Sequence, residues 1–597
     1  MTHRPLRHLA APALTALAAL AGMIPTTAQA CGGFFRTVEP VDQSAERVIF
    51  RQIDANTVES IIDIRYDGPP ADFAWIIPVP GVPRNIDTFS PGVFEYLDRL
   101  TDPQFPLPTD CALAESVRTP DANGCAGDGC DFAGAAGGVT PLDHQIVGDY
   151  EIDTVAATDA QSLVSWLRAH GYRVVDGMTP FIDLYIGQGL NFTAAKLKPG
   201  ADAGGIKPLR MTYASGTPMI PLRLTSIAAL PEMGVKVFLL GDTRATSASV
   251  PELAVDESQI VLDAVSGRAN WPALVARTID NAQGEGMVAD YAQPTDTAVD
   301  ALSALVEQAA QTPENPQMPG VGPEDAATVK TDTAALLASA HYITRLYGRY
   351  SPEEMGVDLT FEAAPNLPNV DAARQIELSQ TIGCDLQAEP SGDPCAFAAC
   401  GQGGLCVLSP DELGVPQAAC ACVDGAVARA VNDSAAPSQT SVSCIDVRMD
   451  VDPVAPVAPN DPLDPGTVET PDGGTHLAPL PKLPNPCDAA PCGAHGACVS
   501  INAQQTCQCE HGYVAIARVD DAGKVSATCQ AASAPVPDDF YKRPLPEPRL
   551  PFPGKAALHG KLTNNGCSVG AVGRGASPLF LILLAAPALV SRRRRSR

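Results

Sequence analysis

Residues 46–66, ERVIFRQIDANTVESIIDIRY, decide the fold class of the N-terminal part of this chain. Two runs within this stretch, 46–53 and 57–66, are rich in β-branched residues and partly alternate between apolar and polar side chains. This pattern is typical of β-strands. Residues 72–83, DFAWIIPVPGVP, predict a short apolar strand that ends at its prolines, and residues 234–242, GVKVFLLGD, predict another buried strand.

Helical patterns lie between and after these strands. Residues 158–174, TDAQSLVSWLRAHGYRV, predict an amphipathic helix that Asp159 caps and Gly171 ends. Its apolar face consists of Ala160, Leu163, Val164 and Leu167. The pattern is also helical around residues 296–310 and 329–347. We therefore predict an α+β head domain over residues 31–380.

The first 30 residues have the composition of a secretory signal peptide. Arg4 and Arg7 precede an apolar run over residues 10–23, and Ala30 ends an A-x-A cleavage site. Cys31 follows directly, so acylation of Cys31 is the alternative to plain cleavage after Ala30. Export would permit disulfide bonds in the mature protein.

The chain of 597 residues carries a formal net charge of −28. An acidic surface of this kind repels nucleic acid and anionic lipid, so we expect no nucleic-acid partner. Proline-rich composition predicts a linker over residues 445–486 and a stalk over residues 530–566, since such segments stay extended.

The 18 cysteines are concentrated in the last third of the chain, where a spacing pattern occurs twice. Both copies read C-x4-C-G-x2-G-x-C-V, continue to a C-x-C pair and close on one more cysteine. A six-cysteine unit in an exported chain predicts a disulfide framework, because so few residues cannot form a sufficient apolar core. Zinc binding by the C-x-C pairs is the alternative, and an oxidising compartment disfavours it.

Both units resemble EGF-like domains, the first over residues 384–444 and the second over residues 487–529. The first is degenerate, since Ala426 stands where the family has an aromatic residue, whereas Gly512 and Tyr513 match it in the second. The resemblance implies that first and third, second and fourth, and fifth and sixth cysteines pair. The implied pairs are Cys395–Cys406, Cys400–Cys420, Cys422–Cys444, Cys487–Cys498, Cys492–Cys507 and Cys509–Cys529.

The remaining cysteines are Cys31, Cys567 and a group of four in or just after the head domain. We hypothesise that this group, Cys111, Cys125, Cys130 and Cys384, forms two disulfides. Acylation would remove Cys31 from disulfide pairing and leave these four cysteines, an even number that two disulfides use completely.

Several separated head motifs occur in an order that resembles a family of exported bacterial proteins, the domain of unknown function 2330. The motifs are CGGFF, VDQSAERVIF, DFAWIIPVPGVP, VGDYEIDTVAATDAQSLVSWLRAHGY, PLRLTSIA and ITRLYGRYSPEEMGVDLTF. The resemblance covers about residues 31–380. It implies export and a shared fold, and it implies no activity.

No motif for catalysis was found in the head domain. Its histidines, His144, His170 and His341, lie far apart in sequence, and none has the spacing of a known metal motif. Residues 121–131, DANGCAGDGCD, begin like a calcium loop, but Cys125 replaces a ligand and the closing glutamate is absent. We therefore predict no catalytic, cofactor-binding or metal-binding residues and no cofactor. A triad of distant residues stays open as the alternative.

The C-terminal segment, residues 567–597, begins at the Gly566-Cys567 pair and contains a short apolar stretch and an arginine cluster. Its apolar stretch, residues 576–590, is 15 residues long, is interrupted by Pro587 and falls short of the about 20 residues that a membrane-spanning helix needs. The order resembles the MYXO-CTERM sorting signal, which implies processing by a sorting protease near Gly566 and Cys567 and lipid attachment at Cys567. An ordinary weak membrane anchor is the alternative.

Together these patterns predict an exported, surface-displayed, non-enzymatic binding or structural protein of the bacterial cell envelope. We expect attachment to the membrane through the C-terminal segment or a lipid, and a protein ligand at the head domain or at the EGF-like modules. The alternatives are an envelope hydrolase with an unrecognised active site in the head domain, and an inner-membrane protein with its head outside the cytoplasm.

Overall fold

The computed structural model places eighteen segments of the chain. It describes residues 33–34, 42–67, 73–106, 139–172, 178–198, 206–263, 267–296, 323–374, 393–411, 413–433, 436–449, 467–469, 475–477, 487, 492–501, 504–520, 524–547 and 549–550. All statements on structure below concern these residues.

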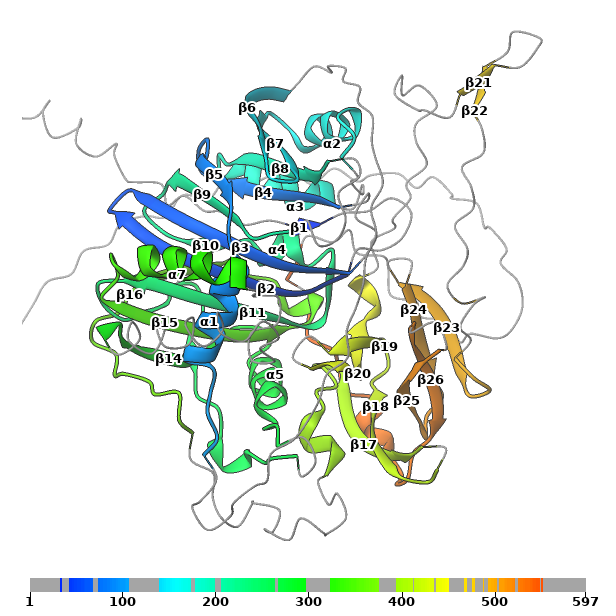
Figure 1. The fold of residues 1–597 in the computed structure, drawn as a ribbon. Helices are drawn as coiled ribbons and strands as arrows, with labels where there is room; N and C mark the ends of the chain where they lie inside the picture. Colours follow the sequence, from blue (N-terminus) through cyan, green and yellow to red (C-terminus); the bar gives the residue numbers. More distant parts are fainter. Residues whose placement is uncertain are drawn as a thin grey trace, which may run out of the picture. The chain divides into compact units, whose positions relative to one another are not determined.

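The largest element of the head domain is an eight-stranded sheet in the order β13-β14-β15-β11-β2-β3-β9-β5 (Figure 1). Its strands are β2 (Asp42–Asp54), β3 (Thr57–Asp67), β5 (Arg84–Thr88), β9 (Leu209–Ala214), β11 (Ala229–Gly241), β13 (Glu252–Leu253), β14 (Met287–Pro294) and β15 (Tyr342–Tyr350). Neighbouring strands are antiparallel except for β2 with β11 and β13 with β14. The predicted strands 46–53, 57–66 and 234–242 all lie in this sheet, which confirms them.

A second sheet has five strands in the order β1-β4-β8-β7-β6. Its strands are β1 (Gly33–Phe34), β4 (Ala74–Val79), β6 (Val139–Val147), β7 (Tyr150–Ala157) and β8 (Asn191–Leu197). The third sheet contains β10 (Met219–Ile220), β12 (Ala245–Ser247) and β16 (Leu359–Ala363). The predicted apolar strand is β4, which ends one residue before Pro80.

Successive side chains along the strands of the head belong alternately to different apolar cores, so the head is built in layers. Val48 and Phe50 of β2 belong to a core shared with Trp75 and Ile77 of β4, so this core joins the two large sheets. Ile49 of β2 belongs to a different core, against the helices on the other face. Side chains of a strand point alternately to opposite faces, so each large sheet buries both of its faces. All six residues of β4 are buried, in agreement with this position.

Helices cover the outer faces of both sheets. The eight-stranded sheet packs against α1 (Gly92–Thr101) and α7 (Pro323–Leu337), and the five-stranded sheet against α2 (Ala160–Ala169) and α3 (Thr179–Gly187). The remaining helices are α4 (Leu222–Thr225), α5 (Trp271–Asn281), α9 (Asp538–Tyr541), η4 (Glu257–Gln259), η5 (Pro352–Glu354), η6 (Pro394–Phe397) and η7 (Val447–Met449).

The predicted helix 158–174 corresponds to α2. Asp159 accepts a hydrogen bond from the backbone N–H of Ser162, and the predicted apolar face is buried. Gly171 follows with φ of +77°, a conformation that glycine adopts without strain.

The helical prediction for residues 329–347 is wrong in its second half. The helix α7 ends at Leu337, and residues from Tyr342 onward form β15. The aromatic and β-branched side chains of this strand pack in a sheet, between β11 and β14, so tertiary pairing determined the outcome.

The cysteine-rich region contains six disulfides, in the pairing that the EGF-like resemblance implies. Each module has two hairpins. Those of the first are β17 (Gly404–Pro410) with β18 (Pro416–Cys422) and β19 (Ala426–Asp433) with β20 (Ala436–Asp446); those of the second are β23 (Gly496–Ile501) with β24 (Gln504–Cys509) and β25 (Tyr513–Val519) with β26 (Val525–Ala531).

The two modules are joined by crossed pairing of their hairpins. One sheet has the order β17-β18-β25-β26 and the other β20-β19-β24-β23, so each contains one hairpin from each module (Figure 1). In the antiparallel register, Cys420 of β18 lies opposite Ala515 of β25, and Cys507 of β24 lies opposite Ala428 of β19. Both cysteines are the fourth of their module, and both alanines follow the fifth cysteine by six residues. The contact is therefore pseudo-twofold symmetric.

Part of the segment predicted as a stalk packs against this pair of modules. Val536, Phe540 and Tyr541 are buried in the core that the two modules share. The hydroxyl of Tyr541 also accepts a hydrogen bond from the backbone N–H of Gly512. The aromatic residues of this segment supply apolar area that its prolines do not, so its described part does not remain apart from the modules. A two-stranded ribbon, β21 (Thr467–Glu469) with β22 (Thr475–Leu477), lies within the predicted linker.

Glu46 is a buried carboxyl group in the central strand β2. Its side chain is 1% exposed, and its described hydrogen bond comes from the amide of Gln43 to Oε2, at 3.2 Å. Burial raises the pKa of Glu46 to about 8. The folded protein therefore retains a proton on Glu46 that the unfolded chain loses near pH 4 to 5.

We expect Glu46→Gln to become more stabilising, relative to the wild type, as the pH rises. The contribution of Glu46 to stability is fully present below its unfolded pKa and is lost as the pH rises through about 8. At pH 9 the variant should gain roughly 3–5 kcal/mol in free energy of unfolding, and at pH 4 almost nothing. Thermal unfolding at several pH values measures this, with the exposed Glu362→Gln as control. Equal gains at both pH values would contradict the prediction.

We expect Ala515→Arg to separate the two modules. Ala515 is fully buried against Cys420, so an arginine there would bury an unpaired charge and destabilise the pair by about 3 kcal/mol or more. The equivalent change, Ala428→Arg, should act similarly. Val519→Arg, on the same strand but 56% exposed, is the control. Calorimetric unfolding under non-reducing conditions checks this, and an unchanged transition for Ala515→Arg would disprove the contact in solution.

Candidate functional site

The strongest polar cluster of the head domain that could bind a ligand lies on the hairpin of β6 and β7. His144 on β6 is directly opposite Asp153 on β7, and Glu151 lies two residues before Asp153. Because side chains two apart in a strand share a face, all three point to the same side of the sheet. Gly148, with φ of +56°, lies in the two-residue turn of this hairpin.

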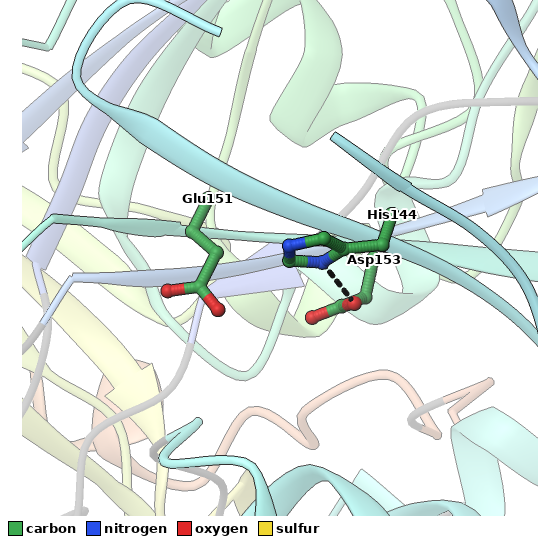
Figure 2. A group of neighbouring side chains, drawn as sticks. All are labelled: His144, Glu151 and Asp153. Carbon is green, nitrogen blue, oxygen red and sulfur yellow. Dashed lines mark hydrogen bonds and ion pairs between the residues drawn. The ribbon is translucent and has the colours of Figure 1, made fainter. Parts of the chain in front are cut away.

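The donor atoms of these three residues are close together. One ligand atom from each lies within 4.8 Å of the others, and His144 Nδ1 is 2.7 Å from Asp153 Oδ1. Figure 2 shows the imidazole between the two carboxylates, with its second nitrogen on the side of Glu151. The side chain of His144 is 54% exposed, whereas those of Glu151 and Asp153 are 31% and 13% exposed.

Two further side chains, Tyr172 and Lys196, each contact one of the two carboxylates. The hydroxyl of Tyr172 donates to Asp153 Oδ2 at 2.7 Å, and Lys196 Nζ lies 3.3 Å from Glu151 Oε2. Burial, and then the nearby charge of Asp153, raise the pKa of Tyr172 well above its ordinary value, so this hydroxyl remains a donor. Lys196 also donates to the backbone carbonyl of His170 at 2.7 Å. The arrangement offers one imidazole nitrogen and two carboxylate oxygens to a cation.

The cluster has no sequence spacing of a known metal motif, because its ligands lie on two strands and meet only across the hairpin. The signal present in the sequence is a histidine and a Glu-x-Asp pair on both sides of the Gly148-Asp149 turn, at positions that face each other in a hairpin. Recognising it required the register of β6 and β7, which the polar, partly exposed β6 does not predict.

A second cluster consists of carboxyl groups around α5 and η5. Asp280 and Glu354 are close enough for each to affect the pKa of the other, and Glu232 and Glu353 are nearby. Burial, and then the charges of Glu232 and Glu354, raise the pKa of Asp280 well above its ordinary value, and burial raises that of Glu353 and of Glu354. One proton between Asp280 and Glu354 is the arrangement expected of two adjoining carboxyls.

A pocket with acidic lining opens beside the second cluster. Glu285, Glu353 and Glu354 contribute to it from the head domain, and Asp446 and Glu547 from the cysteine-rich region. Both oxygens of Glu354 have structural partners, since the backbone N–H of Ser351 donates to Oε2 and the amide of Gln402 donates to Oε1. The geometry thus favours a role of Glu354 in capping η5 and in joining the head to the first module.

A third cluster is an ion-pair network between α1 and the eight-stranded sheet. Arg47 contacts Asp63, Glu95 and Asp98 at 2.5–2.9 Å, and Lys236 contacts Asp98 at 2.9 Å. Arg345, which is 2% exposed, pairs with Asp102 and with the fully buried Asp290. Every member named here has a partner of opposite charge, so the network holds the structure together and does not offer a free reactive group.

Electrostatics within the network differ from residue to residue. Burial opposes ionisation of Asp98, but Lys236, Arg345 and Arg47 outweigh it and hold the pKa of this carboxyl well below its ordinary range. Burial raises the pKa of Asp290, although Arg345 and Arg374 partly offset it.

The other sequence-identified residues are placed as follows. His170 follows the last turn of α2, where its ring stacks on Trp166 and its Nδ1 lies 2.8 Å from the Trp166 carbonyl oxygen. His341 is exposed and pairs with Asp242 at 3.0 Å. The head cysteines Cys111, Cys125, Cys130 and Cys384 and the processing residues Ala30, Cys31, Gly566 and Cys567 lie outside the described residues.

The chain belongs to the bacterial family described as "Uncharacterized protein conserved in bacteria (DUF2330)", which it matches over residues 25–362. This agrees with the resemblance of the head domain. No curated protein and no solved structure matches the chain. Among the helices that could be described, none has the length and apolar character needed to span a membrane, and residues 576–590 lie outside that set.

We expect Asp98→Asn to destabilise the head by about 3 kcal/mol or more, since it leaves Arg47, Arg345 and Lys236 short of a buried counter-charge. Because the pKa of Asp98 is lowered, its contribution is present above the unfolded pKa near 4 and is lost as the pH falls further. Chemical denaturation at pH 7 and pH 2.5 measures both effects. Asp242→Asn, at a side chain that is 86% exposed, is the control and should change little. Equal stability of wild type and Asp98→Asn at pH 7 would contradict the network's role.

Proposed function

We propose that this protein is exported and displayed at the surface of the bacterial cell, where it binds another protein or an envelope component without catalysing a reaction. The observation that carries this proposal is that all twelve cysteines of residues 395–529 form disulfides. Disulfides of this density persist in oxidising compartments, and the apolar signal-like segment at residues 10–23 supports export. EGF-like modules, which the cysteine-rich pair resembles, serve mostly as spacers or protein-binding surfaces.

Attachment to the cell surface follows from the tail. A sorting protease would process the chain near Gly566 and Cys567, and Cys567 would carry a lipid. The proline-rich sequence before Cys567 would then lie between the membrane and the folded part. An inner-membrane protein with its head outside the cytoplasm is the alternative location.

An envelope hydrolase is the second candidate, and one observation favours it. Asp280 and Glu354 influence each other beside an acidic pocket, and two neighbouring carboxyls with raised pKa values are a common acid–base pair. The structural partners of both Glu354 oxygens weigh against it. We therefore prefer the binding role.

The intact mass of the protein recovered from cells that produce it tests the proposal. We expect a chain that begins after Ala30 and ends near Cys567 with a lipid increment, and whose twelve module cysteines react with an alkylating reagent only after reduction. Protease added to intact cells should release the folded part. Cys567→Ala is the matched variant, and it should lose the lipid increment and leave the six disulfides unchanged.

Two results would overturn the proposal. A mass that extends to Arg597 would leave a membrane anchor and refute sorting to the surface. Module cysteines that react without reduction would show that the protein does not reside in an oxidising compartment.

A further inference from the structure

We propose that His144, Glu151 and Asp153 form a binding site for a divalent cation of the zinc and manganese class. The site lies on the β6–β7 hairpin, at the edge of the five-stranded sheet of the head domain (Figure 2). It is independent of the surface-display role proposed above.

The backbone holds the three ligands in place before any ion binds. His144 and Asp153 are register partners in neighbouring strands, and Glu151 is fixed two residues away on the same face. Pairing of β7 with β8 on its other side fixes the carboxylate-bearing strand further. Binding thus needs only side-chain rotation, so little ordering of the chain is lost.

The distances suit a metal ion after a small adjustment. The three donor atoms lie within 4.8 Å of one another, and His144 Nδ1 and Asp153 Oδ1 are 2.7 Å apart. Metal bonds of about 2.0–2.2 Å to histidine nitrogen and carboxylate oxygen place tetrahedral donors roughly 3.4 Å apart. Glu151 would move toward His144, and the His144–Asp153 pair would open slightly to admit the ion.

Outer partners give each carboxylate a defined orientation. Tyr172 holds Oδ2 of Asp153, so Oδ1 faces His144, and Lys196 holds Oε2 of Glu151, so Oε1 is the oxygen that would take the ion. Hydrogen bonds behind the ligands of this kind orient ligands in known metal sites. Tyr172 is therefore a positioning residue, since it acts through Asp153.

Charge at the site favours a cation in spite of Lys196. Two carboxylates outweigh one ammonium group, and the net charge of the chain is −28. Lys196 Nζ also has two favourable contacts apart from Glu151, the carbonyl of His170 at 2.7 Å and the ring of Tyr172 at 4.9 Å. It can thus move away from an incoming ion without losing all of its partners.

The ligand set indicates which ions would bind. One imidazole and two carboxylates suit zinc or manganese better than calcium, which prefers oxygen ligands alone. With three protein ligands and a 54% exposed His144, a further coordination position would face solvent. Water or a donor atom of a binding partner would occupy it.

Metal titration of the whole chain tests the site. Protein stripped with a chelator is titrated with Zn²⁺ and with Mn²⁺ by calorimetry, and with Co²⁺ by its visible absorption. We expect His144→Ala to bind one ion fewer than the wild type or to bind it at least 10-fold more weakly. Glu151→Gln should act similarly, and Tyr172→Phe should weaken binding by about 10-fold or more. His341→Ala, at an exposed histidine with a single carboxylate partner, is the control and should bind like the wild type.

Thermal unfolding provides a second readout. Saturating Zn²⁺ should raise the unfolding temperature of the wild type, and this shift should disappear in His144→Ala. Since His144 is largely exposed, His144→Ala without metal should unfold at the wild-type temperature, so loss of binding would not reflect loss of folding. Equal stoichiometry and affinity for the wild type and His144→Ala, or an absence of binding to the wild type, would overturn the proposal.

Discussion

The ion-pair network beneath α1 is the interaction on which the head domain depends. Arg47, Lys236 and Arg345 come from β2, β11 and β15, and their counter-charges come from α1, β3 and β14. A buried charge without its partner costs several kcal/mol, so the helix and five strands are stable only in one mutual arrangement. The apolar core between the sheets is less directional, because hydrophobic burial depends on area and not on the choice of partner. The network thus supplies the specificity that the core cannot.

In the cysteine-rich region, covalent bonds fix the mutual arrangement of the strands. Its modules contain few large apolar side chains, and their shared core consists largely of cysteines, alanines and valines. Disulfides replace the missing apolar area, and the crossed hairpins then bury the surfaces that each module would expose alone. Arg277 of α5 donates to the carbonyl oxygens of Cys395, Ala396 and Ala398, which connects the head to the first disulfide of this region.

Local patterns in the sequence were sufficient for the strands β2, β3, β4 and β11 and for the capped helix α2, because alternation and periodicity determine these features. The cysteine pairing came from the resemblance to EGF-like domains, since spacing alone does not fix the connectivity of six cysteines. They were not sufficient for β15, because the helical pattern of the preceding α7 was continued into its β-rich sequence. They were also not sufficient for the crossed pairing of the modules. The His144 cluster was also missed, since its residues meet only across strands. Contacts between distant segments depend on strand register and packing, and neither can be read from a short stretch of sequence.

The pseudo-twofold contact of the two modules has a consequence for how they associate. Cys420 with Ala515 and Cys507 with Ala428 are equivalent pairs, so one surface serves as both partners. A surface complementary to itself can be used by two identical copies, as in an ordinary homodimer. In this chain both copies of the surface belong to one polypeptide, so their association is intramolecular and does not depend on protein concentration.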